Sequence, residues 1–464
     1  MLIIFWLGLA IYFPALFNGF IWDDEEQIVN NFLIRSLSNW PKFFTGGTFP
    51  GLDGNLVGLY FRPLTTLITS LIYQVFNLNA WGYHLVQIIF HSFNAILVFL
   101  IINQLTRRRF PACVAGLVFL LHPINAETVV YAANLQDTLY FFFGAGGLYL
   151  ILTGRKWLGT AGLFLSVLSK ETGLLFLILA GFYFPWAGLI SLPYSYLRFI
   201  TAKIFFEKQG LAPITLLDWP QRLIHLPAIT TYYFKTIFWP QNLSINQVWT
   251  VDRIELLPLA VTIILIGLTA IMAKKFKFAG WFFWLWLWLG LAIHWQILPL
   301  DVTVSPRFAY FSLAGLLGLI SLWLPEKPRR LTQIIIGVAI IALAARTVVR
   351  IADWSDNLNF YGKEIRNSSP NFNLENNYGV ELFRQGQVLE SKAHFQRSIE
   401  LAPQWWPNWN NLGVIYEAEK NYPAAENAYL QSIKNGRYSL AYTNLTRLWT
   451  KLNIKKDLND IIGN

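Results

Sequence analysis

The sequence is poor in cysteine and in charged residues. Its 464 residues contain one cysteine, Cys113, which excludes an internal disulfide framework and a metal site built from cysteines. Only 13% of the residues are charged, whereas soluble domains carry about 25%. By contrast, 55% are hydrophobic, and long apolar windows recur from residue 1 to about residue 349. This pattern predicts that most of the chain lies in a lipid bilayer.

Several familiar signatures are also missing. The first 20 residues have no basic region and no small-residue cleavage motif, so we interpret them as a retained helix rather than a signal peptide. Zinc-binding spacings such as HExxH and Gly-rich phosphate loops do not occur. The GAGG sequence at 144–147 lies in an apolar stretch, where small residues let helices pack closely. A divalent cation held by carboxylates remains open.

Eleven apolar stretches are predicted to cross the bilayer. Two of them, 110–121 and 157–169, are short for a crossing, which needs about 20 residues. The stretch Leu64–Phe76 is predicted to be an interfacial or re-entrant helix. The eleven stretches are 2–20, 83–105, 110–121, 128–153, 157–169, 173–193, 223–239, 256–273, 279–298, 308–324 and 331–349.

Basic residues orient these stretches. With the N-terminus inside, the inner links hold fifteen basic and three acidic residues, and the outer links hold six basic and ten acidic residues. The positive-inside rule favours this orientation. It also explains the net charge of +10, so nucleic acid is not an expected partner. Arg198 and Lys203 are assigned to an inner link, and the odd count predicts that the C-terminal part lies outside.

Polar side chains that apolar surroundings tolerate poorly collect on the outer links. The first link, about 22–82, carries the acidic run Asp23–Glu26. Each such residue alone could be a helix cap or a snorkelling arginine, but ionisable groups pressed against membrane helices are costly and indicate functional sites. The candidates are Asp23, Asp24, Arg62, His122, Glu127, Lys170, Glu171 and Arg307.

These residue types suit transfer chemistry at a lipid headgroup. A carboxylate in a partly desolvated pocket can act as a general base. Arginine binds a phosphate bidentately and lysine binds it as a point charge, so Arg62, Lys170 and Arg307 are candidate phosphate ligands. A lipid phosphate would lie at this depth with its tail between helices. The residues therefore predict transfer of a group from a lipid phosphate to an acceptor hydroxyl.

After Phe360 the sequence becomes polar and repeats itself. The segments starting NNYGVELF at Asn376 and NNLGVIYE at Asn410 are offset by 34 residues, the period of tetratricopeptide repeats. We predict a membrane domain over 1–350, a linker over 351–370, and about two repeats with a capping helix over 371–464. Such repeats bind extended partners, or serve here only as a packing module. The run QWWPNW could contact the bilayer, a sugar or peptide, or other helices.

Six motifs follow one another along the chain: WDDEEQIVNN, YFRPLTTLI, WGYHLVQIIFHSFNAILVFL, LLHPINAETVVYAANLQDTLY, LSKETG and SPRFAYFSLAGL. Together they resemble the GT-C superfamily of polytopic glycosyltransferases, and in particular the transmembrane-and-tetratricopeptide-repeat mannosyltransferase-like family and its prokaryotic relatives. The resemblance covers nearly the whole membrane domain. It implies an all-α bundle of about 11 transmembrane helices, GT-C-like, with a short C-terminal α-solenoid.

The resemblance also implies an activity. The family uses a sugar on a polyprenyl or dolichyl phosphate, an acidic base in the first outer loop, and an inverting transfer. By position, Asp23 is the expected base and Asp24 supports the acceptor, with their order open. Arg307 is the expected donor-phosphate ligand, with Lys170 and Arg62 beside it. The supporting polar residues would be Glu127, His122 and Glu171.

Partners and compartment follow from the same resemblance. The acceptor would be a protein, lipid or glycan reached from the outer face and the repeats. The outer face is that of the plasma membrane in a prokaryote and the lumen of the endoplasmic reticulum in a eukaryote. Two other hypotheses remain: a transporter of lipid-linked sugars, which needs polar residues at the bilayer midplane, and a non-catalytic scaffold that works through its repeats.

Overall fold

The structure, a computed structural model, describes residues 1–51, 55–205, 212–436 and 439–454. These residues are mostly helical, with one antiparallel pair formed by β1 (Phe49–Pro50) and β2 (Leu56–Val57). The chain forms two compact units. Unit 1 comprises Met1–Gly210, Ile214–Ile245 and Trp249–Asp356, and unit 2 comprises Leu211–Pro213, Asn246–Val248 and Asn357–Asn464.

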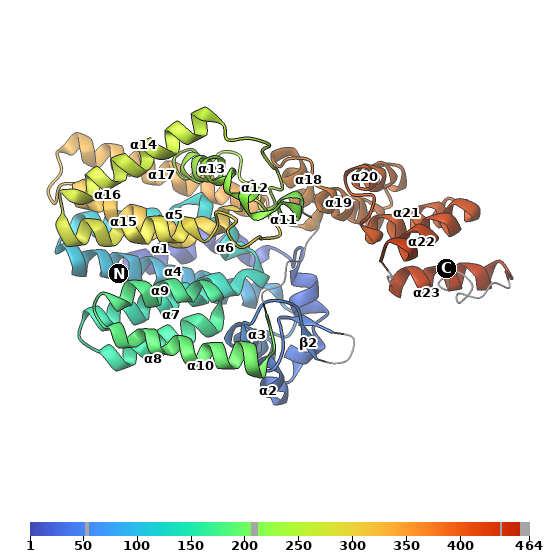
Figure 1. Cartoon of the computed structure of the whole chain (residues 1–464), viewed down its shortest axis with the longest axis horizontal. Helices are drawn as coiled ribbons and strands as arrows, with labels where there is room; N and C mark the ends of the chain where they lie inside the picture. Colours follow the sequence, from blue (N-terminus) through green and yellow to red (C-terminus); the bar gives the residue numbers. More distant parts are fainter. Residues whose placement is uncertain (52–54, 206–211, 437–438, 455–464) are drawn as a thin grey trace. The chain divides into compact units, whose positions relative to one another are not determined.

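Unit 1 is a helical bundle that contains the apolar sequence (Figure 1). Its core is made of Leu, Ile, Val and aromatic side chains from helices that are distant in sequence. The helices of unit 1 and of the link at residue 213 are α1 (Leu2–Tyr12), α2 (Trp40–Phe43), α3 (Pro63–Phe76), α4 (Ala80–Thr106), α5 (Arg109–Leu121), α6 (Ala126–Val130), α7 (Leu135–Leu152), α8 (Lys156–Ser169), α9 (Leu174–Gly181), α10 (Ser191–Ser195), α11 (Pro213–Leu216), α12 (Trp219–Leu223), α13 (Leu226–Phe238), α14 (Leu256–Lys274), α15 (Lys277–Ala292), α16 (Ala309–Trp323) and α17 (Arg330–Ala352).

Five helical stretches are long and apolar enough to cross a membrane. A sixth would be the bent pair Arg109–Leu121 and Pro123–Val130, which meet at 47°. The predicted count of eleven crossings includes shorter helices, and it stays a prediction. The five stretches are Ala80–Thr106, Ala132–Leu152, Leu256–Lys274, Pro306–Trp323 and Arg330–Ala352.

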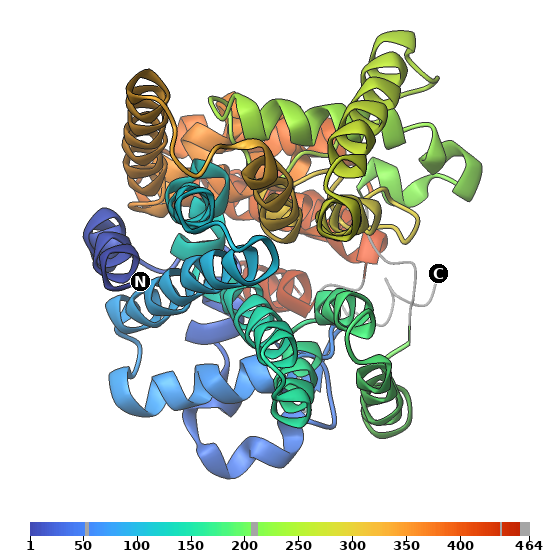
Figure 2. The ribbon, with the colours of Figure 1, turned by 90° about the vertical axis from the view of Figure 1, so that its left-hand side faces the viewer.

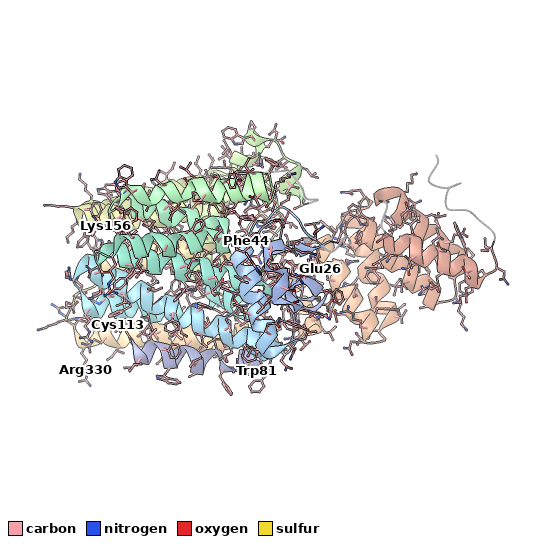
Figure 3. The ribbon with its side chains drawn as sticks, turned by 90° about the horizontal axis from the view of Figure 1, so that it is seen from below. Glu26, Phe44, Trp81, Cys113, Lys156 and Arg330 are labelled. Carbon is pink, nitrogen blue, oxygen red and sulfur yellow. The ribbon has the colours of Figure 1, made fainter. Side chains whose placement is uncertain are left out.

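The two ends of unit 1 carry different residues. Figure 3 shows Lys156 and Arg330 toward one end and Glu26 and Trp81 toward the other. We call the first the basic end; it contains the turns at 107–109, 154–156, 275–277 and 325–330. There Arg108 ties neighbouring turns together by donating to the carbonyl oxygens of Leu322 and Leu324, at 2.6 and 2.5 Å. We call the second the loop end; it contains the long link between α1 and α4.

The stretch 173–193, predicted to cross once, turns back on itself. α9 ends at Gly181, and the chain then continues as a 3-10 helix (Pro185–Ile190), α10 and a π-helix (Tyr196–Thr201). Arg198 Nη1 in this return segment lies 2.9 Å from Glu171 Oε1, at the start of the stretch. The assignment of Arg198 to the inner side is therefore wrong. Hydropathy did not reveal the reversal because residues 182–186 at the turn are themselves mostly apolar.

The stretch 223–239, also predicted to cross, lies at the loop end. At its start, His225 Nε2 accepts a hydrogen bond of 2.9 Å from the amide of Val251. At its end, the carbonyl of Ile237 lies 2.8 Å from His122 Nε2, at the loop end of α5. Figure 2 shows the intervening α13 lying across the bundle. Both ends of the 13-residue α13 are therefore tied to links of the loop end.

Unit 2 consists of helices that pack in pairs. The same contact recurs 34 residues apart, where Gly379 of α19 faces the ring of Phe395 and Gly413 of α21 faces the ring of Tyr429. A Cβ at Gly413 would lie 2.6 Å from that ring, so the repeat needs a small residue there. The helices are α18 (Asn357–Asn367), α19 (Phe372–Arg384), α20 (Val388–Leu401), α21 (Trp406–Ala418), α22 (Tyr422–Gly436) and α23 (Ser439–Lys451).

The tryptophans of QWWPNW contribute to contacts inside unit 2. The ring of Trp405 packs edge-on against Phe372 at 4.9 Å between centroids. The indole N–H of Trp409 donates to the carbonyl of Pro403 at 2.7 Å. Among the alternatives given by the sequence, these contacts favour packing.

The return segment predicts a labelling pattern. In a Cys113→Ala background, Lys203→Cys and Glu26→Cys should react with a membrane-impermeant maleimide from the same side of sealed vesicles. Lys156→Cys should react only from the opposite side. All three positions are exposed, and Lys203 precedes Ile204, whose amide bonds to the carbonyl of Arg198. If Lys203→Cys reacts from the same side as Lys156→Cys, the chain does not return to the loop end after α9.

Candidate functional site

The acidic run begins with two aspartates that have different environments. Asp24 is 1% exposed. Its Oδ2 accepts the amide of Ile21 at 3.0 Å, and its Oδ1 accepts the amide of Ala133 at 2.5 Å. Burial raises the pKa of Asp24 to about 8, although these backbone donors act to lower it. Asp24 therefore fixes the loop after α1 against the segment that precedes α7.

Asp23 keeps a partly exposed side chain. It hydrogen-bonds to the side chain of Tyr131, and the ring of Trp22 stacks on the same tyrosine at 5.8 Å. Burial raises the pKa of Asp23, and the charge of Asp301 acts in the same direction, while Tyr131 and Arg307 oppose the shift. A carboxylate that is partly accessible and held at a raised pKa suits a proton acceptor.

Arg307 lies beside Glu127 at the start of α16. Its Nη1 is 3.3 Å from Glu127 Oε1, which also accepts a hydrogen bond of 3.0 Å from Ser305. Glu127 is 1% exposed, while the Arg307 side chain is 19% exposed. The guanidinium also lies within electrostatic reach of Asp23 and Asp137. The buried carboxylate of Glu127 thus fixes the arginine, and part of the Arg307 side chain stays accessible.

Lys170 is paired in the same way. Its Nζ lies 2.5 Å from Oδ1 of Asp137, whose side chain is 2% exposed. Burial lowers the pKa of Lys170, the pair with Asp137 raises it, and the positive charges of Arg62 and Arg307 lower it further. Three cations from distant parts of the sequence therefore lie near one another. An anion placed among them would reduce the repulsion between the cations.

Glu171 joins three segments of the chain. Its Oε2 lies 3.3 Å from Arg62 Nε, and its Oε1 lies 2.9 Å from Arg198 Nη1. Oε1 also accepts the amide of Phe61 at 3.2 Å. Burial would raise the pKa of Glu171, but the two arginines outweigh it, so the pKa is lowered. Glu171 is therefore an ionised carboxylate that fixes Arg62.

A second contact extends this group to the link before α16. The hydroxyl of Tyr60 donates to Asp301 at 3.3 Å, and the Arg62 guanidinium lies 4.3 Å above the Tyr60 ring. Burial, with the charge of Asp301, raises the pKa of Tyr60 to about 12. Tyr60 is therefore neutral and available to orient Asp301.

Seven of the eight predicted residues lie in this connected region, whereas His122 has a backbone role. Its Nδ1 accepts the amide of Ile124 at 3.1 Å, and its Nε2 bonds to the carbonyl of Ile237. His122 follows α5 directly, and its ring holds the α5–α6 bend against α13.

Several residues of this region are not among the eight candidates predicted from the sequence. Arg198 was placed on the wrong side, and Tyr131 lies within the motif LLHPINAETVVYAANLQDTLY but its residue type does not distinguish it from the other aromatic residues. His294 stacks on Phe308 at 4.2 Å, with the charges of Lys170 and Arg307 nearby. Asp137 lies within the predicted crossing 128–153, and a carboxylate inside an apolar helix is itself a signal for a charged partner.

The ligand set resembles an anion site more closely than a metal site. Within the described residues, no group of three or more His, Cys, Asp or Glu side chains could hold a metal ion. The carboxylates of Glu127, Asp137 and Glu171 pair with cations instead. Arg307, Lys170 and Arg62 together can accept a phosphate, and Asp23 lies on the same side of the bundle.

The sequence is similar to several proteins named as protein O-mannosyl-transferases. The chain is 24% identical to a protein O-mannosyl-transferase of Caenorhabditis elegans over 450 residues, which is 87% of this chain and 63% of the relative. It is 31% identical to the protein O-mannosyl-transferase Tmtc1 of Drosophila melanogaster over 188 residues, 38% of this chain and 21% of the relative. The human protein O-mannosyl-transferase TMTC2 is 32% identical over 141 residues, 29% of this chain and 17% of the relative.

The chain thus spans less than two thirds of the length of these relatives. No family model matches it, and no solved structure matches it. The relatives confirm the resemblance drawn from the motifs. The chain is thus similar, over most of its own length, to a protein named as a protein O-mannosyl-transferase, and over shorter stretches to others of that name.

Proposed function

We propose that the chain is a membrane glycosyltransferase that moves a sugar from a polyprenyl-phosphate-type donor to an acceptor hydroxyl at the loop end. The observation that carries this proposal is the position of Asp23. It is a partly accessible carboxylate with a raised pKa, and it lies within electrostatic reach of Arg307. The names of the relatives supply the sugar-transfer class and suggest mannose.

The proposed reaction is a single displacement. The acceptor hydroxyl donates a hydrogen bond to Asp23, which takes the proton as the acceptor oxygen attacks the anomeric carbon. The bond between that carbon and the phosphate oxygen breaks, and the lipid phosphate leaves with the electron pair. Because attack and departure occur on opposite faces of the sugar, the anomeric configuration inverts.

The cations would stabilise the departing phosphate. Arg307 has five N–H groups, so its contact with Glu127 leaves donors for a phosphate. Lys170 likewise has donors beyond the one directed to Asp137. Donors that are already oriented toward a developing charge lower the barrier without reorganisation. Arg62, fixed by Glu171, would complete the phosphate site.

In this proposal Asp24 positions Asp23 rather than reacting itself. Both of its oxygens are occupied by backbone amides, so its contact with an acceptor would require the loop to rearrange. Glu127 and Glu171 have corresponding roles, because each holds a phosphate-binding arginine. His122 would act at a greater distance by holding the bend that carries Glu127.

The topology proposed for this activity keeps eleven crossings. The return segment 185–201 adds one, and the transverse α13 removes one. At the end of unit 1 the carbonyls of Ile351 and Ser355 accept hydrogen bonds from the Asn18 side chain and the Gly19 amide. The chain therefore leaves unit 1 beside the first loop. We propose that unit 2 follows on the acceptor side, which is outside in a prokaryote and lumenal in a eukaryote.

The relatives are named for protein O-mannosylation, so a protein hydroxyl is the acceptor that we propose first. A transporter would need polar groups along its crossing path, whereas the ion pairs described above gather at the loop end. A scaffold that works only through its repeats would not require Asp23 to keep a raised pKa beside Arg307.

The assignment of the base predicts a difference between neighbouring carboxylates. Asp23→Asn should lower the initial rate by about 100-fold to 10,000-fold, the usual contribution of a general base. Glu26→Gln, which neutralises an exposed carboxylate in the same run, should change the rate by less than about 2-fold. The measurement is release of polyprenyl phosphate by purified protein with mannosyl donor and an acceptor peptide. Equal rates for wild type and Asp23→Asn would exclude this base.

The charges around Asp23 predict the pH dependence. The rate should rise with pH as Asp23 loses its proton, with a midpoint above the ordinary aspartate pKa of about 3.9. Asp301 raises the pKa of Asp23, so Asp301→Asn favours the ionised base and should move this limb to lower pH. Asp252→Asn, at an exposed position, is the matched control and should leave the limb in place. A limb moved upward by Asp301→Asn would contradict the assignment.

A further inference from the structure

Unit 2 contains a row of asparagines that the proposed chemistry does not use. The first helix of each repeat carries one asparagine at the same position: Asn376 on α19, Asn410 on α21 and Asn444 on α23, spaced by 34 residues. Asn377 and Asn411 follow directly in the first two repeats. We call these five residues and Asn373 the asparagine row.

The side chains of this row are hydrogen-bonded in series across three helices. The amide of Asn444 donates to Asn410 at 2.9 Å, Asn410 to Asn411 at 3.3 Å, and Asn411 to Asn376 at 2.8 Å. Asn376 then donates to Asn377 at 3.1 Å, and Asn377 to Asn373 at 2.8 Å. Each bond points the same way along the row. The series therefore fixes the orientation of every amide in it.

The orientation leaves matching groups for a ligand. A carboxamide has two N–H donors and two acceptor lone pairs. Within the described hydrogen bonds, Asn377 and Asn411 each use one donor and one lone pair in the series. Both are partly exposed, whereas Asn376 and Asn410 are 5% and 4% exposed behind them. Each accessible amide can therefore offer one donor and one acceptor, the pair that a peptide unit requires.

The spacing and charge of the row fit a polypeptide backbone. Packed helices lie about 8–10 Å apart, and an extended chain advances about 3.3 Å per residue, so successive repeats would meet every third residue. Charged residues on the helices that carry the row are paired: Glu417 of α21 lies 2.9 Å from Arg447 and 3.5 Å from Lys451 of α23, and Glu381 of α19 lies 2.7 Å from Arg384. The row itself consists of neutral amides, which give no preference for an acidic or a basic sequence.

Other ligands fit this surface less well. A phosphate or anionic headgroup would find neutral amides beside cations that already have partners. A sugar usually stacks on an exposed aromatic ring, but Trp405, Trp406 and Trp409 are only partly exposed, and two of them make the internal contacts described above. We propose that the asparagine row binds the main chain of an extended, uncharged polypeptide segment, largely independently of its sequence. This inference does not depend on the transferase activity.

The test uses the full chain in lipid nanodiscs and a fluorescent 12-residue peptide of Ser, Thr, Ala and Val. We expect saturable binding by anisotropy, with affinity that changes less than about 3-fold when the sequence is scrambled. The same peptide N-methylated at every third residue lacks backbone N–H groups that would donate to the asparagine side-chain oxygens. It should therefore bind at least about 10-fold more weakly. No saturable binding up to about 1 mM, or equal binding of the methylated peptide in every register, would overturn the proposal.

Variants locate the binding surface. The double variant Asn377→Ala/Asn411→Ala should weaken peptide binding about 10-fold and remove the penalty for N-methylation. Asn435→Ala changes an asparagine on α22 that bonds only to the carbonyl of Gln431 among its described contacts, and should bind like wild type. Hydrogen exchange in α21 and α22 reports whether unit 2 remains folded. If the double variant unfolds, the proposal is decided by comparing the unmethylated and the N-methylated peptide on the wild-type chain. Binding of mannotetraose without peptide binding would contradict the proposal in favour of a glycan.

Discussion

The contacts of Glu171 organise the loop end of unit 1. One carboxylate joins Arg62 of the first loop, Arg198 of the return segment and the amide of Phe61. Arg198 and Arg62 are 3% and 11% exposed, while the Glu171 side chain is 24% exposed. Loss of the carboxylate would leave both largely buried arginines without this partner, which is destabilising. These contacts therefore join the loop, the return segment and the start of α9. Arg62 then keeps its position beside Lys170 and Arg307.

The same principle recurs in the other pairs of the site. Glu127 holds Arg307, and Asp137 holds Lys170, in each case with the carboxylate more buried than the cation. Charges in an apolar bundle need such partners. The cations Arg307 and Lys170 are therefore the more accessible members of these pairs, and the carboxylates are the more buried members. A lipid phosphate could then bind without leaving a cation unpaired when it departs. Asp23 lies outside these pairs, which keeps it available for a proton.

Much of this site could be predicted from the sequence, because the positive-inside rule and the outer links locate polar residues without a structure. The errors have physical causes. The turn after α9 is apolar, so hydropathy joined two segments into one and placed Arg198 on the wrong side. α13 is apolar yet lies across the bundle, which composition does not reveal. Asp23 and Asp24 are the same residue type, and they differ in their contacts: Asp24 accepts the amides of Ile21 and Ala133, whereas Asp23 bonds to Tyr131 and stays partly exposed. The repeat period located the helix pairs of unit 2, but the hydrogen-bond series along the asparagines depends on side-chain orientations that a period does not specify.

The central claim is that the buried carboxylates present the cations to a lipid phosphate. It is tested most directly by the affinity of the chain for polyprenyl phosphate, measured by intrinsic tryptophan fluorescence in nanodiscs. Replacing the Arg307 pair by the neutral pair Glu127→Gln/Arg307→Gln avoids leaving a buried charge unpaired. We expect this variant to bind at least about 10-fold more weakly, while the control Glu26→Gln, at an exposed position, binds like wild type. If the neutral pair binds polyprenyl phosphate as tightly as wild type, the account of the site is contradicted.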